Sequence, residues 1–179
     1  DNRLYKIEQC FFCCVELGVF LGGIWFGVEL GIQKEELVKA VRYVKPVEHR
    51  LELKPKGDIV FIDDAFNSNP KGAKMALDVL DKMPGQKIII TPGMIEMGEK
   101  QYDLNYNFGK QISEVVDYAL LVGPKQTKPI QDGLNDSSFS SDKMFVFKST
   151  DDAFKHLQSI KKEKTFVLLE NDLPDSFNE

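Results

Sequence analysis

The sequence predicts an α/β protein built on a doubly wound, mostly parallel β-sheet with helices on both faces. From residue 51 onward, short apolar runs typical of strands alternate with longer amphipathic runs typical of helices. The strand-like runs KIII (87–90) and FVLL (166–169) are almost continuously apolar, which is typical of strands covered on both sides. This alternation indicates parallel βαβ units, whose right-handed crossovers place helices on both faces of the sheet.

Composition bounds the class of protein. The chain has 179 residues, 42% of them hydrophobic and 28% charged, which suits a soluble protein of one large domain or one domain plus a fragment. Its net charge is -5 and it has no basic tract, so nucleic acid is not expected as a partner. Cys10, Cys13 and Cys14 are expected to be buried reduced thiols of a cytosolic protein, with a metal or redox pair as the alternative.

The N-terminal part differs from the rest. Residues 11–32 are strongly apolar but interrupted by Glu16 and Glu29, which favours a buried helix or packed segment over a membrane span. A helix with apolar positions at helical spacing follows and ends before Pro46. We therefore expect a boundary near residues 45–48, with the remnant of one domain plus a linker at 1–47 and a second domain at 48–179.

The second domain should follow a regular order of elements. Asn69 and Thr150 are the candidate N-caps of two helices, Pro70 suits a first helical turn, and Gly133 should end a short helix. A hairpin at 50–59 should add an edge to the sheet. The expected strands lie at 58–66, 86–93, 119–123, 143–149 and 164–172, and the expected helices at 69–83, 100–118, 125–133 and 150–160.

Polar residues follow the strands at the edge where ligands of such sheets bind. They come from four strand ends, which are Asp63, Asp64, Asn67 and Asn69 after the first long strand, Thr91 to Gly93 with Glu96 after the next, Gly123 after the third, and Glu170 to Asp172 after the last. One rim of the sheet should thus collect carboxylates, amides and glycine turns.

The acidic stretch IDDAFNSNP allows three interpretations. Asp64 with Asn67 and Asn69 could hold the ribose or base of a nucleotide, since these groups pair well with sugar hydroxyls. Asp63 and Asp64 could instead bind Mg²⁺. The same residues could also simply cap the helix and shape the turn.

Several other site classes lack their patterns in this sequence. There is no G-x-x-x-x-G-K-[ST] phosphate loop, no G-x-G-x-x-G after a strand and no G-x-S-x-G nucleophile turn. A phosphorelay receiver would need an aspartate after its third strand, and neither KIIITPG nor YALLVG supplies one. His156 is expected to pack on a helix, whereas Arg50 stands at the domain boundary, where it could bind a phosphate or carboxylate.

Several segments together resemble a known family. EHRLEL, IDDAFNSNPKGAKMAL, TPGMIEMGEKQYDLNYNFG and LLENDLPD occur in this order. They are similar to the C-terminal domain of the Mur ligases, and the most similar type is UDP-N-acetylmuramoyl-tripeptide–D-alanyl-D-alanine ligase (MurF). The resemblance runs from about Gly31 to the end, and the DD-x-[YF]-N-x-N-P element is its most specific part.

The resemblance implies a Rossmann-like domain of a cytoplasmic ligase of peptidoglycan biosynthesis. Such an enzyme uses ATP and Mg²⁺, through an acyl phosphate, to join D-alanyl-D-alanine to a UDP-muramoyl tripeptide. Carried over, Arg50, Asp64, Asn67 and Asn69 would contact ATP. Gly93, Met94 and Glu96 would lie near the incoming dipeptide. The central domain of the family holds the phosphate loop and the metal, so no catalytic or metal-binding residue is expected here and the isolated chain should be inactive. The alternative is a non-catalytic nucleotide-binding or interaction module of the same fold.

Overall fold

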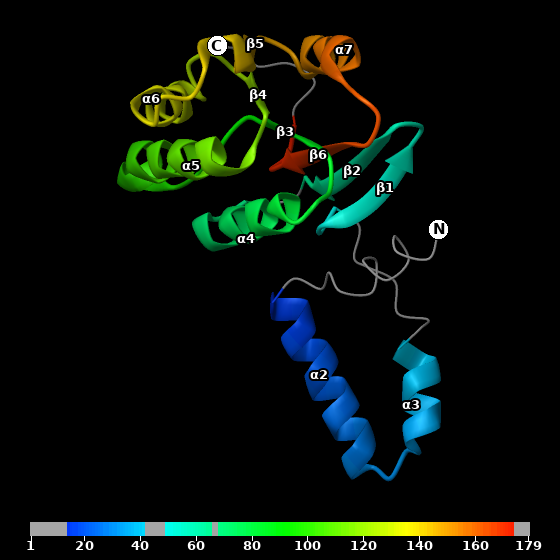
Figure 1. Cartoon of the computed structure of the whole chain (residues 1–179). Coiled ribbons are helices and arrows are strands. Elements are labelled where there is room, and N and C mark those ends of the chain that lie inside the picture. Colours follow the sequence, from blue (N-terminus) through cyan, green and yellow to red (C-terminus); the bar gives the residue numbers. More distant parts are fainter. Residues whose placement is uncertain (1–13, 42–48, 66–67, 174–179) are drawn as a thin grey trace. The chain divides into compact units, whose positions relative to one another are not determined.

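The computed structural model describes residues 14–41, 49–65 and 68–173. The chain divides into two compact units, residues 1–52 and 53–179 (Figure 1). The expected boundary at 47–48 falls within residues 42–48, outside the described part of the chain, as do Cys10 and Cys13.

The first unit contains two helices, α2 (Cys14–Glu29) and α3 (Lys34–Val41). They approach closely at Gly27, where a Cβ atom would lie 2.8 Å from Leu37 Cδ2. The expectation of a buried apolar helix is wrong at its C-terminal end, because Trp25 is 65% and Phe26 60% exposed. Within the first unit, the one other helix described is α3, whose eight residues are too few to cover α2. No helix among the described residues has the length and apolar character needed to cross a bilayer.

The second unit contains a six-stranded sheet, and its first strand begins one residue before the unit. The strands are β1 (Glu52–Lys56), β2 (Ile59–Asp64), β3 (Gln86–Thr91), β4 (Tyr118–Val122), β5 (Met144–Phe147) and β6 (Thr165–Glu170). Their order is β1-β2-β6-β3-β4-β5, and each neighbouring pair from β2 to β5 is parallel. The predicted α/β fold is thus confirmed. The chain's last strand lies between β2 and β3, so distant segments meet in the centre of the sheet.

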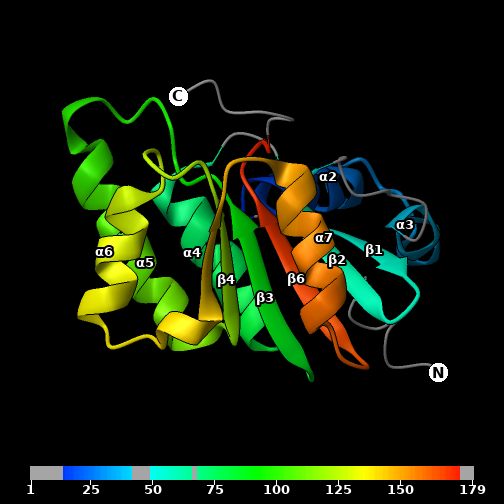
Figure 2. The ribbon, with the colours of Figure 1, turned by 90° about the horizontal axis from the view of Figure 1, so that it is seen from above.

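Helices cover both faces of this sheet (Figure 2). The helix α7 (Thr150–Ile160) packs on one face against β4 and β5. On the other side α4 (Pro70–Asp81) packs against β6 and against α5 (Gln101–Val115), and α6 (Lys128–Asp136) packs on α5. Two short 3₁₀ turns, Gly98–Lys100 and Ser141–Lys143, precede α5 and β5.

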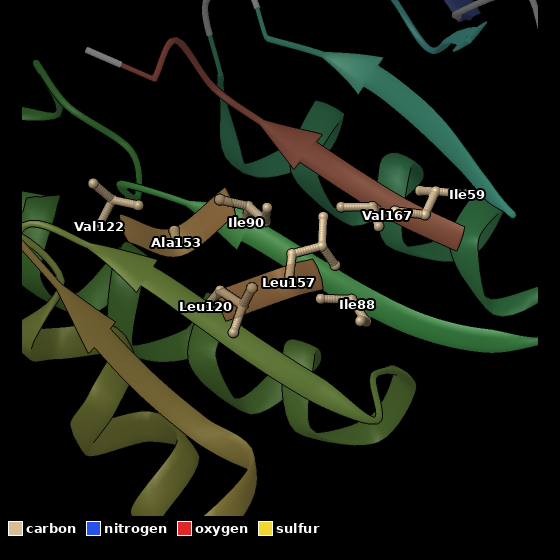
Figure 3. Packing of buried hydrophobic residues seen from close by; sticks show 8 residues of the cluster. All are labelled: Ile59, Ile88, Ile90, Leu120, Val122, Ala153, Leu157 and Val167. Carbon is tan, nitrogen blue, oxygen red and sulfur yellow. The ribbon is translucent and has the colours of Figure 1, made fainter. Parts of the chain in front are cut away.

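The core under α7 explains why the strands are apolar. Ala153 and Leu157 of α7 point at alternate residues of the central strands, and all of them are buried (Figure 3). The strand residues in this cluster are Ile59, Ile88, Ile90, Leu120, Val122 and Val167. Because successive side chains of a strand point to opposite faces, the residues between them serve the face covered by α4 and α5.

Two helix starts test the capping predictions. Asn69 is the N-cap of α4, as predicted, and its Oδ1 accepts hydrogen bonds from the backbone N–H groups of Lys71 and Gly72. Thr150 is not the cap of α7. Ser149 is, because its Oγ accepts the N–H of Asp152 and Thr150 already lies in the helix. Adjacent hydroxyl residues offer equivalent caps, and the position of the turn decides between them.

The predicted end of α6 at Gly133 is also wrong, since the helix continues to Asp136. A Cβ at Gly133 would lie 2.1 Å from the Tyr106 carbonyl oxygen of α5, and one at Gly109 would lie 2.3 Å from the Ile130 carbonyl oxygen. These glycines therefore let the backbones of α5 and α6 touch. A glycine near the end of an amphipathic run can mark either a helix end or a close contact between helices, and the sequence around Gly133 does not distinguish the two.

Candidate functional site

The carboxyl ends of three adjacent strands, β2, β6 and β3, form the candidate site. Asp64 and Glu170 are partners in the parallel register of β2 and β6. Thr91 ends β3 on the other side of β6. The crevice outside these strand ends is where open α/β sheets bind ligands. The polar rim predicted from the sequence is therefore real at these three strands.

The two adjacent aspartates serve opposite faces of the sheet. Asp63 is only 4% exposed, and its Oδ2 accepts a 2.6 Å hydrogen bond from the Lys54 ammonium group of β1. Its Oδ1 accepts the backbone N–H of Ala65. Asp64, the next residue, points to the face of α4. Because Asp63 and Asp64 point to opposite faces, the alternative in which both bind one Mg²⁺ ion does not fit.

Asp64 instead has an acidic neighbour, Glu170. The Glu170 side chain is 1% exposed, and its Oε1 accepts a 2.5 Å hydrogen bond from Ser68 Oγ. Burial, followed by the charge of Asp64, raises the pKa of Glu170 to about 8 from its ordinary 4.5, against the lowering effect of the Ser68 hydrogen bond. A pKa in this range favours the protonated form of Glu170 at neutral pH, beside the Asp64 carboxyl group.

Asn171 joins the three strand ends through its side chain and backbone. Its Nδ2 donates a 2.7 Å hydrogen bond to the Gly93 carbonyl oxygen after β3, and its Oδ1 accepts the backbone N–H of Ser68 after β2. Its own backbone N–H donates to the Asp64 carbonyl oxygen. The residue has a φ of 68°, a left-handed conformation that asparagine tolerates better than most residues. Asn171 therefore fixes the mutual positions of the two loops that line the site.

The turn after β3 is fixed by hydrogen bonds with the side chain of Asn105 in α5. Asn105 is completely buried, and its Oδ1 accepts the Met94 N–H while its Nδ2 donates to the carbonyl oxygens of Met94 and Gln101. Gly93 has a φ of 82°, and a Cβ there would lie 2.7 Å from Asn105 Oδ1. Only glycine therefore fits at this position without strain.

A cavity of about 400 Å³ lies beside Met94, between the start of α4 and the side of α5. Its lining mixes apolar and amide side chains with one lysine, which are Pro70, Met94, Leu104, Asn107, Phe108, Lys110 and Gln111. Such a lining suits a small molecule that carries both apolar and polar groups.

The structure describes three of the four other predicted site residues. Asn69 is exposed, and its Oδ1 is used for the helix cap. Glu96 is exposed in a left-handed conformation with a φ of 60°. Arg50 is half-buried and belongs to the first unit, whereas Asn67 lies outside the described residues. Among the described residues, no cluster of three metal-ligating side chains exists.

Two residues of this site, Asn105 and Ser68, and the Lys54 partner of Asp63 were not predicted from the sequence. Asn105 could have been found, because it shares a helical face with Phe108, Gly109 and Ile112, and a buried amide needs partners. Ser68 and Lys54 gave no comparable signal. Their roles depend on which strands lie beside β2, and this cannot be read from local spacing.

Comparison with known proteins identifies the family. A family model described as "Mur ligase, glutamate ligase domain" matches residues 49–170. The UDP-N-acetylmuramoyl-tripeptide–D-alanyl-D-alanine ligases of Buchnera aphidicola and Bacillus subtilis are 27% and 29% identical over 111 and 99 residues. These stretches are 62% and 54% of this chain, but only 23% and 21% of the two relatives.

Solved structures agree on the fold. The MurF structure of Acinetobacter baumannii matches with a TM-score of 0.76 at 22% identity, over 91% of this chain and 36% of that one. The MurF ligase of Thermotoga maritima in complex with ADP matches with a TM-score of 0.68 at 19% identity, over 83% and 32% of the two chains. The chain therefore belongs to the Mur ligase family and contains its C-terminal, glutamate ligase domain at residues 49–170.

Proposed function

We propose that this chain is the C-terminal part of a cytoplasmic, ATP-dependent ligase of peptidoglycan biosynthesis. The enzyme adds D-alanyl-D-alanine to a UDP-muramoyl tripeptide through an acyl phosphate. The observation that carries the proposal is the family match over residues 49–170, together with two relatives that bear this activity in their names. Residues 1–47 are then the end of the central domain plus a linker.

The nucleotide side of the site comprises Arg50, Asp64, Asn67 and Asn69. The fit of a nucleotide rests on the donor set at the rim. The Asp64 carboxylate can accept hydrogen bonds from ribose hydroxyls, and the amide nitrogen of Asn69 can donate to an oxygen. The related Thermotoga maritima ligase was solved with ADP, which supports nucleotide use in this fold. Mg²⁺ is assigned to the central domain.

The dipeptide side comprises Gly93, Met94 and Glu96. The turn from Gly93 to Met94 is rigid because Asn105 and Asn171 hold its backbone. The adjoining cavity carries Lys110, whose ammonium group can pair with the carboxylate of a dipeptide. The task of this domain is to align the incoming amine and to exclude water, because an acyl phosphate is lost to hydrolysis when water reaches it.

The isolated chain is expected to bind but not to catalyse, because its sequence contains no phosphate-loop pattern. The test is to titrate the chain with ATP and, separately, with the UDP-muramoyl tripeptide, and then to assay D-alanyl-D-alanine addition. Binding of ATP without turnover is the expected result. Turnover by the chain alone would contradict the assigned division of labour, and tight binding of another nucleotide without ATP binding would contradict the ligase assignment.

The same absence favours the second candidate, a non-catalytic nucleotide-binding or interaction module of this fold. The reading frame that encodes the chain separates the two candidates. Continuation upstream into a G-x-x-G-K-T segment supports the ligase. A gene with no such segment supports the module.

A further inference from the structure

Glu170 is a buried acid for which the proposed nucleotide contacts have no use. It ends β6 in register with Asp64 of β2, and both side chains point to the face covered by α4. A lone buried carboxylate is costly, so a glutamate at 1% exposure needs partners for both of its oxygens. Ser68 satisfies Oε1.

The second carboxyl oxygen of Glu170 lacks a hydrogen-bond partner. Glu170 Oε2 is buried and has no hydrogen-bond donor among the described residues. The Asp64 carboxyl is near enough to affect Glu170 both by charge and by a side-chain hydrogen bond. Two carboxyl groups can share a hydrogen bond only when one of them carries a proton. A proton on Glu170 would therefore satisfy its buried oxygen and bind the Asp64 carboxylate at the same time.

We propose that Glu170 is a positioning residue whose protonated side chain, held by Ser68, fixes the orientation of the Asp64 carboxylate toward the hydroxyl groups of a bound nucleotide. This role rests on the proposed nucleotide site. The Ser68 hydroxyl donates to Glu170, Glu170 donates to Asp64, and the Asp64 carboxylate presents its oxygens to the hydroxyl groups of the ligand. Such a chain of hydrogen bonds leaves the carboxylate fewer orientations to lose when the ligand binds.

Among the described residues, Asp64 is the charged group that affects the ionisation of Glu170. Asp63 and its partner Lys54 lie on the other face of β2, and β3 presents the uncharged Thr91 beside β6. The charged groups of α4 are all exposed, and these are Lys71, Lys74, Asp78 and Asp81. Deprotonation of Glu170 would place a second negative charge beside the Asp64 carboxyl group. It would also repel the phosphates of the ligand.

The first experiment observes the proton itself. Carboxyl carbons of the full chain are followed by ¹³C NMR from pH 5 to 9, with Glu170→Gln to assign the resonance and the exposed Glu163→Gln as the matched control. One glutamate resonance is expected to stay protonated at pH 7 and to titrate at lower pH in Asp64→Asn, where the repelling charge is gone. A Glu170 that is ionised at pH 7 overturns the proposal, whatever the chain binds.

The second experiment measures ADP binding by NMR titration at pH 6.5 and pH 9. The unmodified chain and Glu163→Gln are expected to lose about tenfold in affinity at the higher pH, whereas Glu170→Gln, which cannot ionise, should bind equally at both. Glu170→Leu should bind about tenfold more weakly than the unmodified chain at pH 6.5, because it cannot donate to Asp64.

These outcomes separate this role from the proposed function. ADP binding that is the same in the unmodified chain, Glu170→Gln and Glu170→Leu at both pH values overturns the positioning role and leaves the nucleotide site intact. No ADP binding by the unmodified chain at either pH overturns the nucleotide site and the positioning role with it. Thermal unfolding of each variant, followed by circular dichroism, shows whether a loss of affinity reflects a loss of fold.

Discussion

At the scale of single residues, the alternation of side chains along β2 gives its two terminal aspartates different tasks. Asp63 binds Lys54 inside the hairpin edge, and Asp64 faces the candidate site. Mutation of each aspartate in turn can therefore distinguish the structural role of Asp63 from the role of Asp64 in the candidate site. The sequence predicted a polar strand end, but only the strands lying beside β2 show which carboxylate is structural.

Asp64→Ala should weaken ATP or ADP binding about tenfold or more, because a charge-assisted hydrogen bond to the ligand is lost. Its free energy of unfolding should fall by only about 1 kcal/mol, the net contribution of the hydrogen bond that Asp64 shares with the protonated Glu170. Calorimetric titration and urea unfolding measure the two effects. Asp63→Ala is the contrasting variant and should lose about 1–2 kcal/mol of stability through its broken bond to Lys54. If Asp64→Ala unfolds instead, Asp64 is structural.

Asn105→Ala should destabilise the chain by about 3 kcal/mol, because it leaves the buried N–H and carbonyl groups of Met94 without their partner. The matched control is Asn135→Ala, at an exposed position of α6, which should change the unfolding free energy by less than about 0.5 kcal/mol. Urea unfolding gives both values. Equal stability of the two variants would show that the turn after β3 does not depend on Asn105.

At the scale of elements, the contact between α5 and α6 depends on glycine as much as on apolar side chains. Gly109 and Gly133 each remove a Cβ from the path of a facing backbone carbonyl. The amphipathic pattern predicted both helices. It gave the bounds of α7 correctly, but α5 ends at Val115 and not at the predicted residue 118, because Tyr118 already begins β4. The pattern failed at Gly133 because helix packing is a contact between distant segments, whereas the sequence signal for a helix end is local.

Gly109→Ala should cost about 1–3 kcal/mol of stability, because the new methyl group would lie 2.3 Å from the Ile130 carbonyl oxygen and push the helices apart. Gly72→Ala in α4 is the control. Its methyl group would meet only the side chain of the N-cap Asn69, at 3.3 Å. The higher helix propensity of alanine should offset this tight contact and keep the stability within about 1 kcal/mol of the unmodified chain. Thermal unfolding of both variants decides. A Gly109→Ala chain as stable as Gly72→Ala would contradict the close backbone contact.

At the scale of the whole molecule, strand order decided what local patterns could not. The α/β class followed from alternating patterns, and the rim followed from the direction of the strands. The pairing of Asp64 with Glu170 could not be predicted in this way, because the last strand of the chain, β6, inserts between β2 and β3. The burial of Glu170 and its raised pKa depend on that insertion.

Stability should therefore depend on pH in an unusual direction. The folded chain holds the Glu170 proton up to about pH 8, whereas the unfolded chain releases it above about pH 4.5. The stabilisation is fully present below pH 4.5 and is lost as the pH rises through 8. We expect the free energy of unfolding to fall between pH 5 and 8, by up to about 1.4 kcal/mol per unit.

Urea unfolding at intervals of one pH unit measures this slope, and Glu170→Gln should remove most of it. The pKa values of Asp132, Asp142 and Asp152 are lowered by hydrogen bonds from Lys128, Ser140 and Ser149, so these groups act below this range. A slope that is equal in the two proteins would show that Glu170 is ionised in the folded state.

The exposed C-terminal end of α2 contains a fluorescent probe, Trp25. Trp25 is the chain's single tryptophan, and two-thirds of its surface meets solvent. Its fluorescence should emit at the long wavelength of a hydrated indole and shift to the blue when another surface covers the helix. Because the second unit contains no tryptophan, this emission reports on the first unit alone. A blue shift of the emission maximum on addition of a candidate partner domain would show that this domain binds over the exposed end of α2.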